Sequence, residues 1–394
     1  MGSSTNQSKA ATLVDQANVE LMQAFQTLIE GDFQTRWQIA KRLPELGDAA
    51  IAPLIDLAQA ATAEVELRWF VIRILGAFHR PEVVTVLAQL MIDSDDDDLS
   101  AVAAQMLAQM GSLTIDTLTQ LLAQGQQRRL AVKALSQIRQ RPVIAPLLAV
   151  ASDEDAELRY LAVETLGSFH DDRVTPVLLA ALNDPAAAVR REAILALSRR
   201  HDLRDAQSLI ERLALRLQDI RLDVCCSAAI AVGRLGGPQA APVLTRCLLR
   251  ETTPELLQIE LVRALSWLSE AGAYRGLEQA LELSPVVRSE AIQALGQQPI
   301  EQRQQALQPL ANWLETVDLA AQPTEVKLSV TLSLSRLRAT HLLGYLIPLL
   351  TDADSRVQVH AQAALKQMEP AASPAIFAAA DGQALVETAA EQSR

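Results

Sequence analysis

The chain repeats a short segment at intervals of about 31 residues. Each copy has an apolar residue, an arginine, two variable positions, and then small or apolar residues that end in leucine and glycine or serine. The clearest copies are Leu67–Gly76, Leu158–Gly167, Val189–Ser198 and Val287–Gly296. A repeat of this length is typical of stacked helix pairs, because one pair cannot bury its apolar face alone. The period therefore predicts an all-α chain in which successive helical hairpins stack on one another.

About eleven hairpins fit this register, forming an α-solenoid that winds into a curved superhelix. The second helix of each hairpin is predicted to begin at Thr35, Leu67, Leu99, Gln127, Leu158, Val189, Val224, Leu257, Val287, Val326 and Val357. The first helices are expected in between, for example at Leu342–Leu350 and at Leu307–Val317, where Pro309 would stand in the first turn. Proline is tolerated best there, since those amides have no helical partner.

The domain organisation follows from the limits of this register. We expect a polar N-terminus and capping helix over residues 1–30, the repeat array over residues 31–369, and an alanine-rich tail or capping helix over residues 370–394. The widest interval between second helices predicts a long loop near Thr316–Thr324. Apolar residues recur at spacings of three, four and seven rather than alternating, so no strand of any length is predicted.

Composition excludes several classes of function. The net charge of −12 lacks the basic footprint that nucleic-acid binding needs. No apolar run approaches the length of a membrane span, and the polar start Met1–Ala10 has no apolar core of a signal peptide. Three cysteines are too few for a disulfide framework, so a cytoplasmic location is expected.

A cation recurs at the second position of the second helices. The set is Arg36, Arg68, Arg128, Arg159, Arg190, Arg288 and Lys327. Asp153 and Asp184 each stand six residues before one of these arginines. One interpretation is an Asp–Arg ladder that ties each turn to its neighbour, because the planar guanidinium suits paired acceptors. The alternative is a stripe that binds an external anion.

The third and seventh positions of each second helix share a face, since they lie four residues apart. On the concave side of a solenoid they would line a groove that is aromatic and basic in the N-terminal half and mostly apolar in the C-terminal half. Aromatic and arginine side chains are common interface anchors, and an aliphatic groove suits a partner helix. The alternative is packing between adjacent helices. The candidate groove for a protein partner consists of Trp37, Lys41, Trp69, Arg73, Arg129, Lys133, Tyr160, Arg191, Leu195, Cys226, Ile230, Ile259, Arg263 and Leu328.

No catalytic constellation is recognisable. The chain has no P-loop, no GxGxxG, no GxSxG and no HExxH, so no catalytic residue and no resident cofactor or metal are predicted. The cysteines Cys226 and Cys247 are candidates for contact with an iron–sulfur cluster. A buried structural thiol is the competing interpretation, because the adjacent pair Cys225 and Cys226 points about 100° apart on a helix.

The repeats resemble the short HEAT repeats of the phycobilisome-lyase-like family, and residues 158–198 carry the resemblance most clearly. It covers most of the chain, more weakly over 99–140 and 301–330. The best-known members are cyanobacterial. They include bilin lyase subunits, phycobilisome degradation adaptors and a partner of an A-type iron–sulfur scaffold. The related deoxyhypusine hydroxylases need His–Glu pairs for di-iron, and no histidine here precedes a glutamate.

The resemblance implies three functions. The first is a non-enzymatic scaffold or assembly adaptor in phycobilisome or photosynthetic protein biogenesis, which grips a protein in its concave groove. The second is a bilin lyase subunit, in which Arg129, Lys133 and Arg191 hold the propionates and Trp69 or Tyr160 stacks on the pigment. The third is an iron–sulfur assembly partner, in which Cys226 or Cys247 approaches the cluster.

Overall fold

The computed structural model describes residues 18–60, 62–203 and 209–368. All regular elements in these ranges are helices, which confirms the all-α fold predicted from the repeat. In the same part of the chain, no helix is both long enough and apolar enough to cross a membrane. The predicted tail over residues 370–394 and the polar start of the chain lie outside the described residues.

The chain divides into two compact units, Met1–Ala181 and Leu182–Arg394, here called unit 1 and unit 2. Residues 18–30 of unit 1 are helical. The elements that follow are α2 (Phe33–Arg42), η1 (Leu43–Leu46), η2 (Asp48–Ala50), α3 (Ile51–Gln59), α4 (Val65–Leu75), α5 (Pro81–Asp93), α6 (Asp97–Gln109), η3 (Gly111–Thr114), α7 (Ile115–Ala123), α8 (Arg128–Gln137), η4 (Arg141–Val143), α9 (Ile144–Val150), α10 (Ala156–Leu166) and α11 (Val174–Ala181).

Unit 2 continues the same pattern. Its elements are α12 (Ala187–Ser198), η5 (His201–Leu203), α13 (Leu209–Arg216), α14 (Leu222–Leu235), α15 (Ala240–Leu248), α16 (Glu255–Ser266), α17 (Ala271–Ala280), α18 (Pro285–Gly296), η6 (Ile300–Gln302), α19 (Arg303–Thr316), α20 (Thr324–Arg336), η7 (Thr340–Tyr345), η8 (Ile347–Thr351) and α21 (Ser355–Met368).

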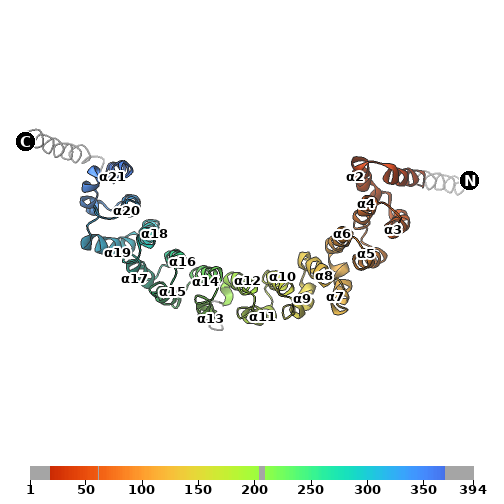
Figure 1. Cartoon of the computed structure of the whole chain (residues 1–394), viewed down its shortest axis with the longest axis horizontal. Helices are drawn as coiled ribbons and strands as arrows, with labels where there is room; N and C mark the ends of the chain where they lie inside the picture. Colours follow the sequence, from red (N-terminus) through yellow and green to blue (C-terminus); the bar gives the residue numbers. More distant parts are fainter. Residues whose placement is uncertain (1–17, 61, 204–208, 369–394) are drawn as a thin grey trace, which may run out of the picture. The chain divides into compact units, whose positions relative to one another are not determined.

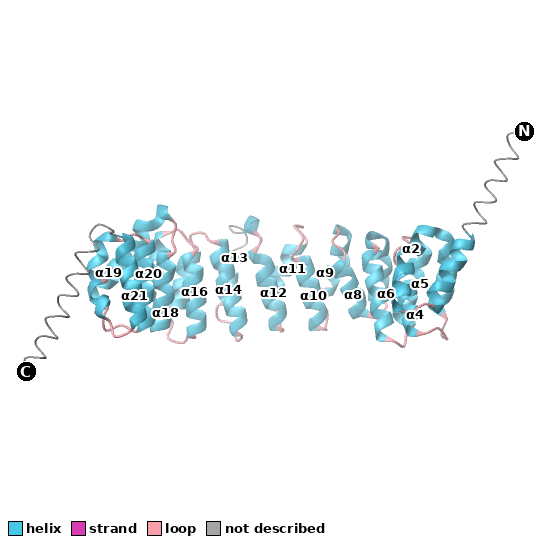
Figure 2. Ribbon diagram, turned by 90° about the horizontal axis from the view of Figure 1, so that it is seen from above, coloured by secondary structure: helices cyan, strands magenta, loops and turns pink. Residues whose placement is uncertain are grey.

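Each unit consists of two layers of helices. In unit 1 the second helices α2, α4, α6, α8 and α10 contact one another in sequence, and the first helices α3, α5 and α7 do the same. In unit 2 the second helices are α12, α14, α16, α18, α20 and α21. Figure 1 shows the second helices on the inner side of the bend of each unit, and Figure 2 shows the helices of one unit running side by side. The solenoid predicted from the period is therefore present.

Second helices begin two residues earlier than predicted, except α8, which begins at Arg128, one residue after the predicted Gln127. Helix α4 starts at Val65 rather than Leu67, and α6 starts at Asp97 rather than Leu99. The prediction took the first buried apolar residue as the start, but a polar turn before it is already helical. The side chain of Asp96 accepts the amides of Asp98 and Leu99 and so caps α6.

Two first helices of unit 2 also differ from the prediction. Helix α19 starts at Arg303, which leaves Pro309 inside the helix rather than in its first turn. The helix expected over Leu342–Leu350 is replaced by the 3₁₀ helices η7 and η8. Gly344 and Pro348 fall within this stretch, and both residues disfavour a continuous α-helix. The predicted long loop is present, because residues 317–323 separate α19 from α20.

The small residue that closes the repeat pattern has a packing role. A Cβ added at Gly76, at the end of α4, would lie within 3.0 Å of the side chain of Met106 on α6. A Cβ at Gly296 on α18 would overlap Ser333 of α20 in the same way. Neighbouring second helices thus approach so closely at this position that only a small residue fits.

Candidate functional site

The candidate groove residues of unit 1 lie on the accessible face of its second helices. They are all exposed or half-buried, whereas their chain neighbours Arg36, Phe70 and Arg159 are buried. We call this set the unit 1 face: Trp37, Lys41, Trp69, Arg73, Arg129, Lys133 and Tyr160. Because adjacent second helices contact one another, equivalent positions form rows along the unit.

The groove residues predicted for unit 2 are also accessible. Arg191 and Arg263 are exposed, and the other five are half-buried: Leu195, Cys226, Ile230, Ile259 and Leu328. Half-burial means that these aliphatic side chains both pack between neighbouring helices and present a part of their surface. The unit 2 face is consequently less polar than the unit 1 face.

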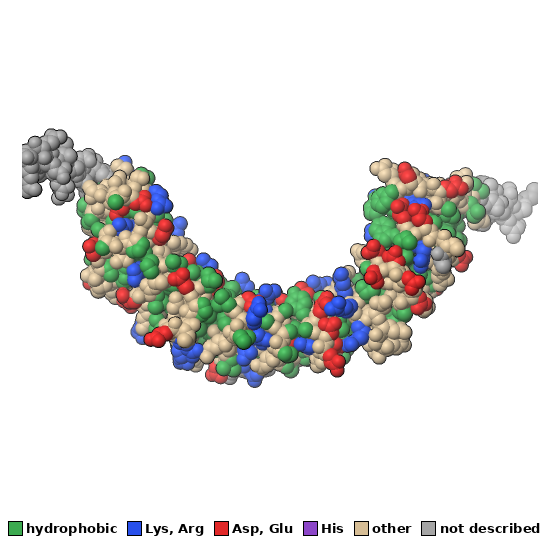
Figure 3. All heavy atoms as spheres, viewed as in Figure 1, with side chains coloured by type: hydrophobic (Ala, Val, Ile, Leu, Met, Phe, Trp, Pro, Cys, Tyr) green, Lys and Arg blue, Asp and Glu red, His purple; other side chains and the backbone are tan. Residues whose placement is uncertain are grey.

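Aromatic side chains gather where α2 meets α4. The ring of Phe33 stacks near Trp37 with centroids 6.4 Å apart, and both contact the buried Phe70 edge-on. Trp69 also packs edge-on against Phe70, with ring centroids 5.1 Å apart. Trp37 keeps 39% of its surface exposed. Figure 3 shows hydrophobic side chains at the inner edge of unit 1 beside these two helices.

Two cations stack on this aromatic cluster. The guanidinium of Arg73 lies 4.7 Å from the ring centre of Trp69 and 5.6 Å from that of Trp37, so it contacts both indoles. The ammonium of Lys41 lies 5.6 Å from the Trp37 ring. Cation–π contacts hold a charged group in place without consuming its hydrogen-bond donors. The fork of Arg73 is therefore fixed in orientation while its N–H groups remain available.

The cations of the two faces differ in their partners. Among the described residues, no carboxylate pairs with Lys41, Arg73 or Lys133. Arg129, by contrast, pairs with Asp155 and Glu157. On unit 2, Arg263 occupies the same repeat position as Arg73 but binds Glu260 at 2.7 Å and Glu290 at 2.8 Å.

A hollow of about 720 Å³ opens beside the aromatic cluster. Its lining includes Phe33 of α2, Trp69 of α4, Ala101 of α6, and Leu130 and Lys133 of α8. The third position of successive second helices runs from Trp69 through Ala101 to Arg129. The hollow therefore arises where a small side chain stands between two large ones.

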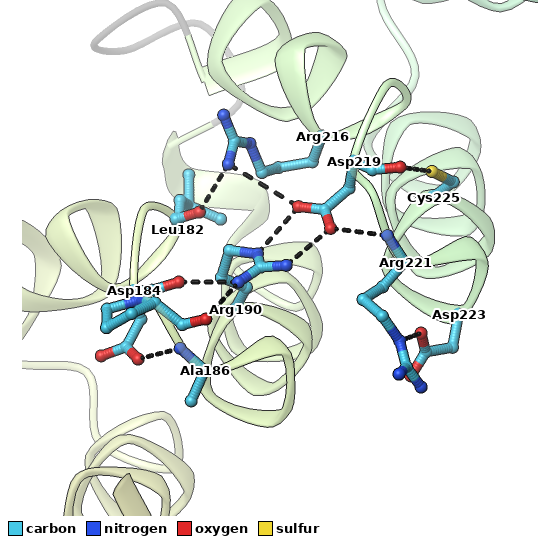
Figure 4. Close-up of polar contacts among 10 residues, drawn as sticks. Leu182, Asp184, Ala186, Arg190, Arg216, Asp219, Arg221, Asp223 and Cys225 are labelled. Atoms are coloured by element: carbon cyan, nitrogen blue, oxygen red, sulfur yellow. Dashed lines mark hydrogen bonds and ion pairs between the residues drawn. The ribbon is translucent and has the colours of Figure 1, made fainter.

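The repeated arginines form a ladder inside the units, not an open anion site. In unit 2, the buried Arg190 donates from Nε and Nη2 to the carboxylate of Asp219 at 2.8 and 2.6 Å (Figure 4). Its Nη1 donates to the main-chain oxygens of Asp184 and Pro185. Arg190 thus joins its own interhelical turn to the turn of the next hairpin.

Other members of the set make the same type of contact. Arg36 donates to the main-chain oxygens of Leu28 and Ile29 and pairs with Glu64 and Glu66, while Lys327 pairs with Asp352 at 2.6 Å. The expected ladder is confirmed, with one correction. The residues six positions earlier, such as Asp184, contribute a main-chain oxygen, and the carboxylate comes from the following hairpin.

The electrostatics of Asp219 depend on this network. Burial by itself raises the pKa of Asp219. The hydrogen bonds from Arg190 and from the Arg221 amide, together with the charges of Arg190 and Arg216, outweigh burial and hold the pKa below its usual value. The main-chain oxygen of Asp219 also accepts from the Cys225 thiol at 3.2 Å.

The cysteines have the character of packing residues. Cys225 and Cys247 are buried, Cys226 is half-buried, and all three are free thiols. Burial raises the pKa of Cys225 to about 11 and raises the pKa of both other thiols, which disfavours the thiolate that metals and electrophiles need. In the described ranges, no three His, Cys, Asp or Glu side chains are grouped so that they could hold a metal ion.

Known protein families confirm the repeat type. The HEAT-repeat family matches residues 19–108, 51–136 and 144–225, which together are half of the chain. The chain is a HEAT-repeat protein. The PBS lyase HEAT-like repeat also matches residues 224–250. No curated protein matches the chain.

Several solved HEAT solenoids share the fold. A Kap121p mutant aligns with a TM-score of 0.58 and 13% identity, over 90% of this chain and 46% of its own. Kap95p bound to RanGDP aligns with a TM-score of 0.55 and 14% identity, over 88% of this chain and 54% of its own. Importin beta aligns with a TM-score of 0.51 and 15% identity, over 91% of this chain and 61% of its own. This HEAT-repeat chain spans about half the length of these proteins.

Sequence reasoning missed Phe33 as part of the site. Phe33 precedes the predicted start of its helix, yet it lies in the first turn of α2, four residues before Trp37, and stacks on that ring. Placing the helix start two residues earlier would have shown this pair. Ala101 was also not selected, because a small residue shows its significance only when its large neighbours in adjacent repeats are considered.

Proposed function

We propose that this HEAT-repeat protein is a non-enzymatic scaffold or assembly adaptor that holds a protein partner against its second helices. The observation that carries the proposal is the accessible Trp37–Arg73–Trp69 stack, with Lys41 and Lys133 nearby and unpaired among the described residues. Partly exposed tryptophan and arginine side chains are the typical anchors of protein interfaces. The fold shared with Kap95p, which is bound to RanGDP in its structure, supports the same class of function.

We further propose that the partner belongs to phycobilisome or photosynthetic protein biogenesis. The support is the match of the PBS lyase HEAT-like repeat to residues 224–250. The three free thiols agree with a reducing compartment such as the cytoplasm.

A bilin-handling function is the second candidate, and the hollow favours it. Trp69 and Lys133 line a space of about 720 Å³, which suits a flat pigment with an acidic group. Arg129 contributes less than the resemblance implied, because it is paired with Asp155 and Glu157. Adding phycocyanobilin to the purified protein tests this candidate, since binding would shift the visible absorption. The iron–sulfur alternative has no comparable support, because Cys247 is buried, Cys226 is half-buried, and burial raises the pKa of both thiols.

Site-specific photocrosslinking tests the scaffold function. A photoreactive amino acid is placed at Gln137 of α8, which lines the hollow, or at Gln120 of α7, which is exposed on the first-helix layer of the same hairpin. In an extract of the native cell, we expect a discrete protein adduct from position 137 and none from position 120. Equal adducts at both positions, or none at position 137, would refute the proposed face.

A further inference from the structure

The unit 1 face carries a stripe of hydrogen-bond donors. The seventh positions of four neighbouring second helices are Lys41 of α2, Arg73 of α4, Gln105 of α6 and Lys133 of α8. Consecutive members of this helix series contact one another, so the stripe is continuous. No carboxylate among the described residues pairs with its three cations. Their donors are thus free to bind acceptors from outside the chain.

Apolar surface runs beside the stripe. Phe33, Trp69, Ala101 and Leu130 belong to the hollow that Lys133 and Gln105 also line. The carboxylates near the hollow, Glu66 and Asp98, stand in the first turns of their helices, at the opposite ends from the stripe. Glu66 is already held by Arg36. The face therefore has an apolar centre, donors along one side and acids along the other.

We propose that the unit 1 face binds an acidic linear peptide, whose carboxylates pair with Arg73, Lys41 and Lys133 while a large apolar side chain fills the hollow beside Ala101. This inference rests on the proposed function and specifies the chemistry of the partner. A guanidinium that is fixed in orientation can form a bidentate pair with a carboxylate, and the adjacent tryptophan rings exclude water from that pair.

The length of the bound segment follows from helix packing. Four neighbouring helices at about 9 Å between axes span roughly 27 Å. An extended peptide covers that distance in about eight residues. A nucleic acid is the competing ligand for stacked cations, but the acidic edge at Glu66 and Asp98 and the apolar hollow favour a peptide.

The test selects ligands for the full chain from a displayed library of random peptides about twelve residues long, which exceeds the footprint. We expect enriched sequences with several Asp or Glu residues around one aromatic or leucine. The best of these peptides is then labelled and titrated by fluorescence polarisation. Arg73→Gln should weaken its binding about tenfold or more, because a charged hydrogen-bonded pair is lost.

Matched variants identify the cause of any loss of peptide affinity. Arg80→Gln removes an arginine that precedes α5 in the first-helix layer of the same unit and already pairs with Asp48, so it should leave the affinity unchanged. Arg73→Lys keeps the charge but loses the planar fork, and should have an intermediate effect. Ala101→Trp, at an exposed position, should fill the hollow and so weaken peptide binding, although every cation is kept.

Four results would overturn the inference: no enriched peptide, enrichment of neutral or basic peptides, equal effects of Arg73→Gln and Arg80→Gln, or displacement of the peptide by single-stranded RNA of similar length. Its failure is distinguishable from failure of the scaffold function. If the crosslinked native partner at position 137 persists in the Arg73→Gln variant, the scaffold function holds and the acidic peptide is wrong.

Discussion

Replacing Asp219 by alanine should destabilise unit 2 far more than the same change at Asp223, four residues later. The Arg190–Asp219 pair is enclosed, with side-chain exposures of 9% and 4%. Arg221 and Asp223 form a pair nearby that is 64% and 44% exposed (Figure 4). The two changes remove the same chemical group from the same stretch of chain, and differ in burial.

The magnitude follows from the contacts that remain. In Asp219→Ala, Nη1 of Arg190 keeps its two main-chain acceptors, but Nε and Nη2 lose theirs in a site closed to water. Two charge-assisted hydrogen bonds are worth about 1.5–3 kcal/mol each. Breaking a buried ion pair on one side costs about 3–5 kcal/mol, which agrees. Asp223→Ala removes an exposed pair worth about 1 kcal/mol at most.

Hydrogen exchange read by mass spectrometry is the appropriate assay, because repeat arrays do not always unfold in one step. Asp219→Ala should accelerate exchange over residues 184–190 and 219–225 and lower the urea midpoint, whereas Asp223→Ala should leave both near the wild-type values. Equal effects of the two variants would show that the ladder does not hold adjacent hairpins together.

The pH dependence provides an independent check on the same pair. The pKa of Asp219 is lower in the folded protein than the ordinary value of 3.8. Its contribution to stability is therefore complete above that ordinary value and is lost as the pH falls through the lower folded pKa. The stability difference between wild type and Asp219→Ala should be constant near neutral pH and shrink in acid. A difference that grows in acid would contradict the assignment.

Three further predictions concern packing, thiol reactivity and binding. Gly296→Val should lower the melting temperature, since overpacking costs about 1–3 kcal/mol, while Gln297→Val at the exposed neighbouring position should not. Iodoacetamide should alkylate the half-buried Cys226 before the two buried thiols, as measured by peptide mass spectrometry; simultaneous loss of all three would contradict their burial. Trp69→Ala and Arg191→Glu should each reduce recovery of the native partner in a pull-down, and normal recovery by both would mean that the proposed faces are wrong.

Much of the fold could be predicted because the repeat constrains it. One register places the second helices in order, and it puts Trp37, Trp69 and Tyr160 on accessible positions. Helix starts were less exact, since the first polar turn carries no apolar signal. The 3₁₀ helices over Thr340–Thr351 were missed because their apolar spacing resembles that of an ordinary first helix.

The partners of charged residues could not be predicted, because pairing depends on which hairpin follows in space. Arg73 and Arg263 look equivalent in the sequence, yet only Arg263 binds carboxylates among the described residues. The sequence pairs Asp184 with Arg190, whereas the acceptor carboxylate is Asp219, 29 residues further along. The hollow beside Ala101 is likewise a property of three adjacent helices and not of any one repeat.

The ladder gives the array a direction. Arg190 donates to main-chain oxygens of its own turn, but its counter-ion belongs to the next hairpin. Deleting hairpins from the C-terminal side would therefore leave a buried arginine without its carboxylate. Deleting them from the N-terminal side would leave only an aspartate at the new surface. In α21, the last helix that the structure describes, the equivalent position is Gln358, which donates to the main-chain oxygen of Asp352 and needs no counter-ion. A neutral amide at that place, like Gln258 at the same position of α16, needs only a main-chain acceptor and no carboxylate from a following hairpin.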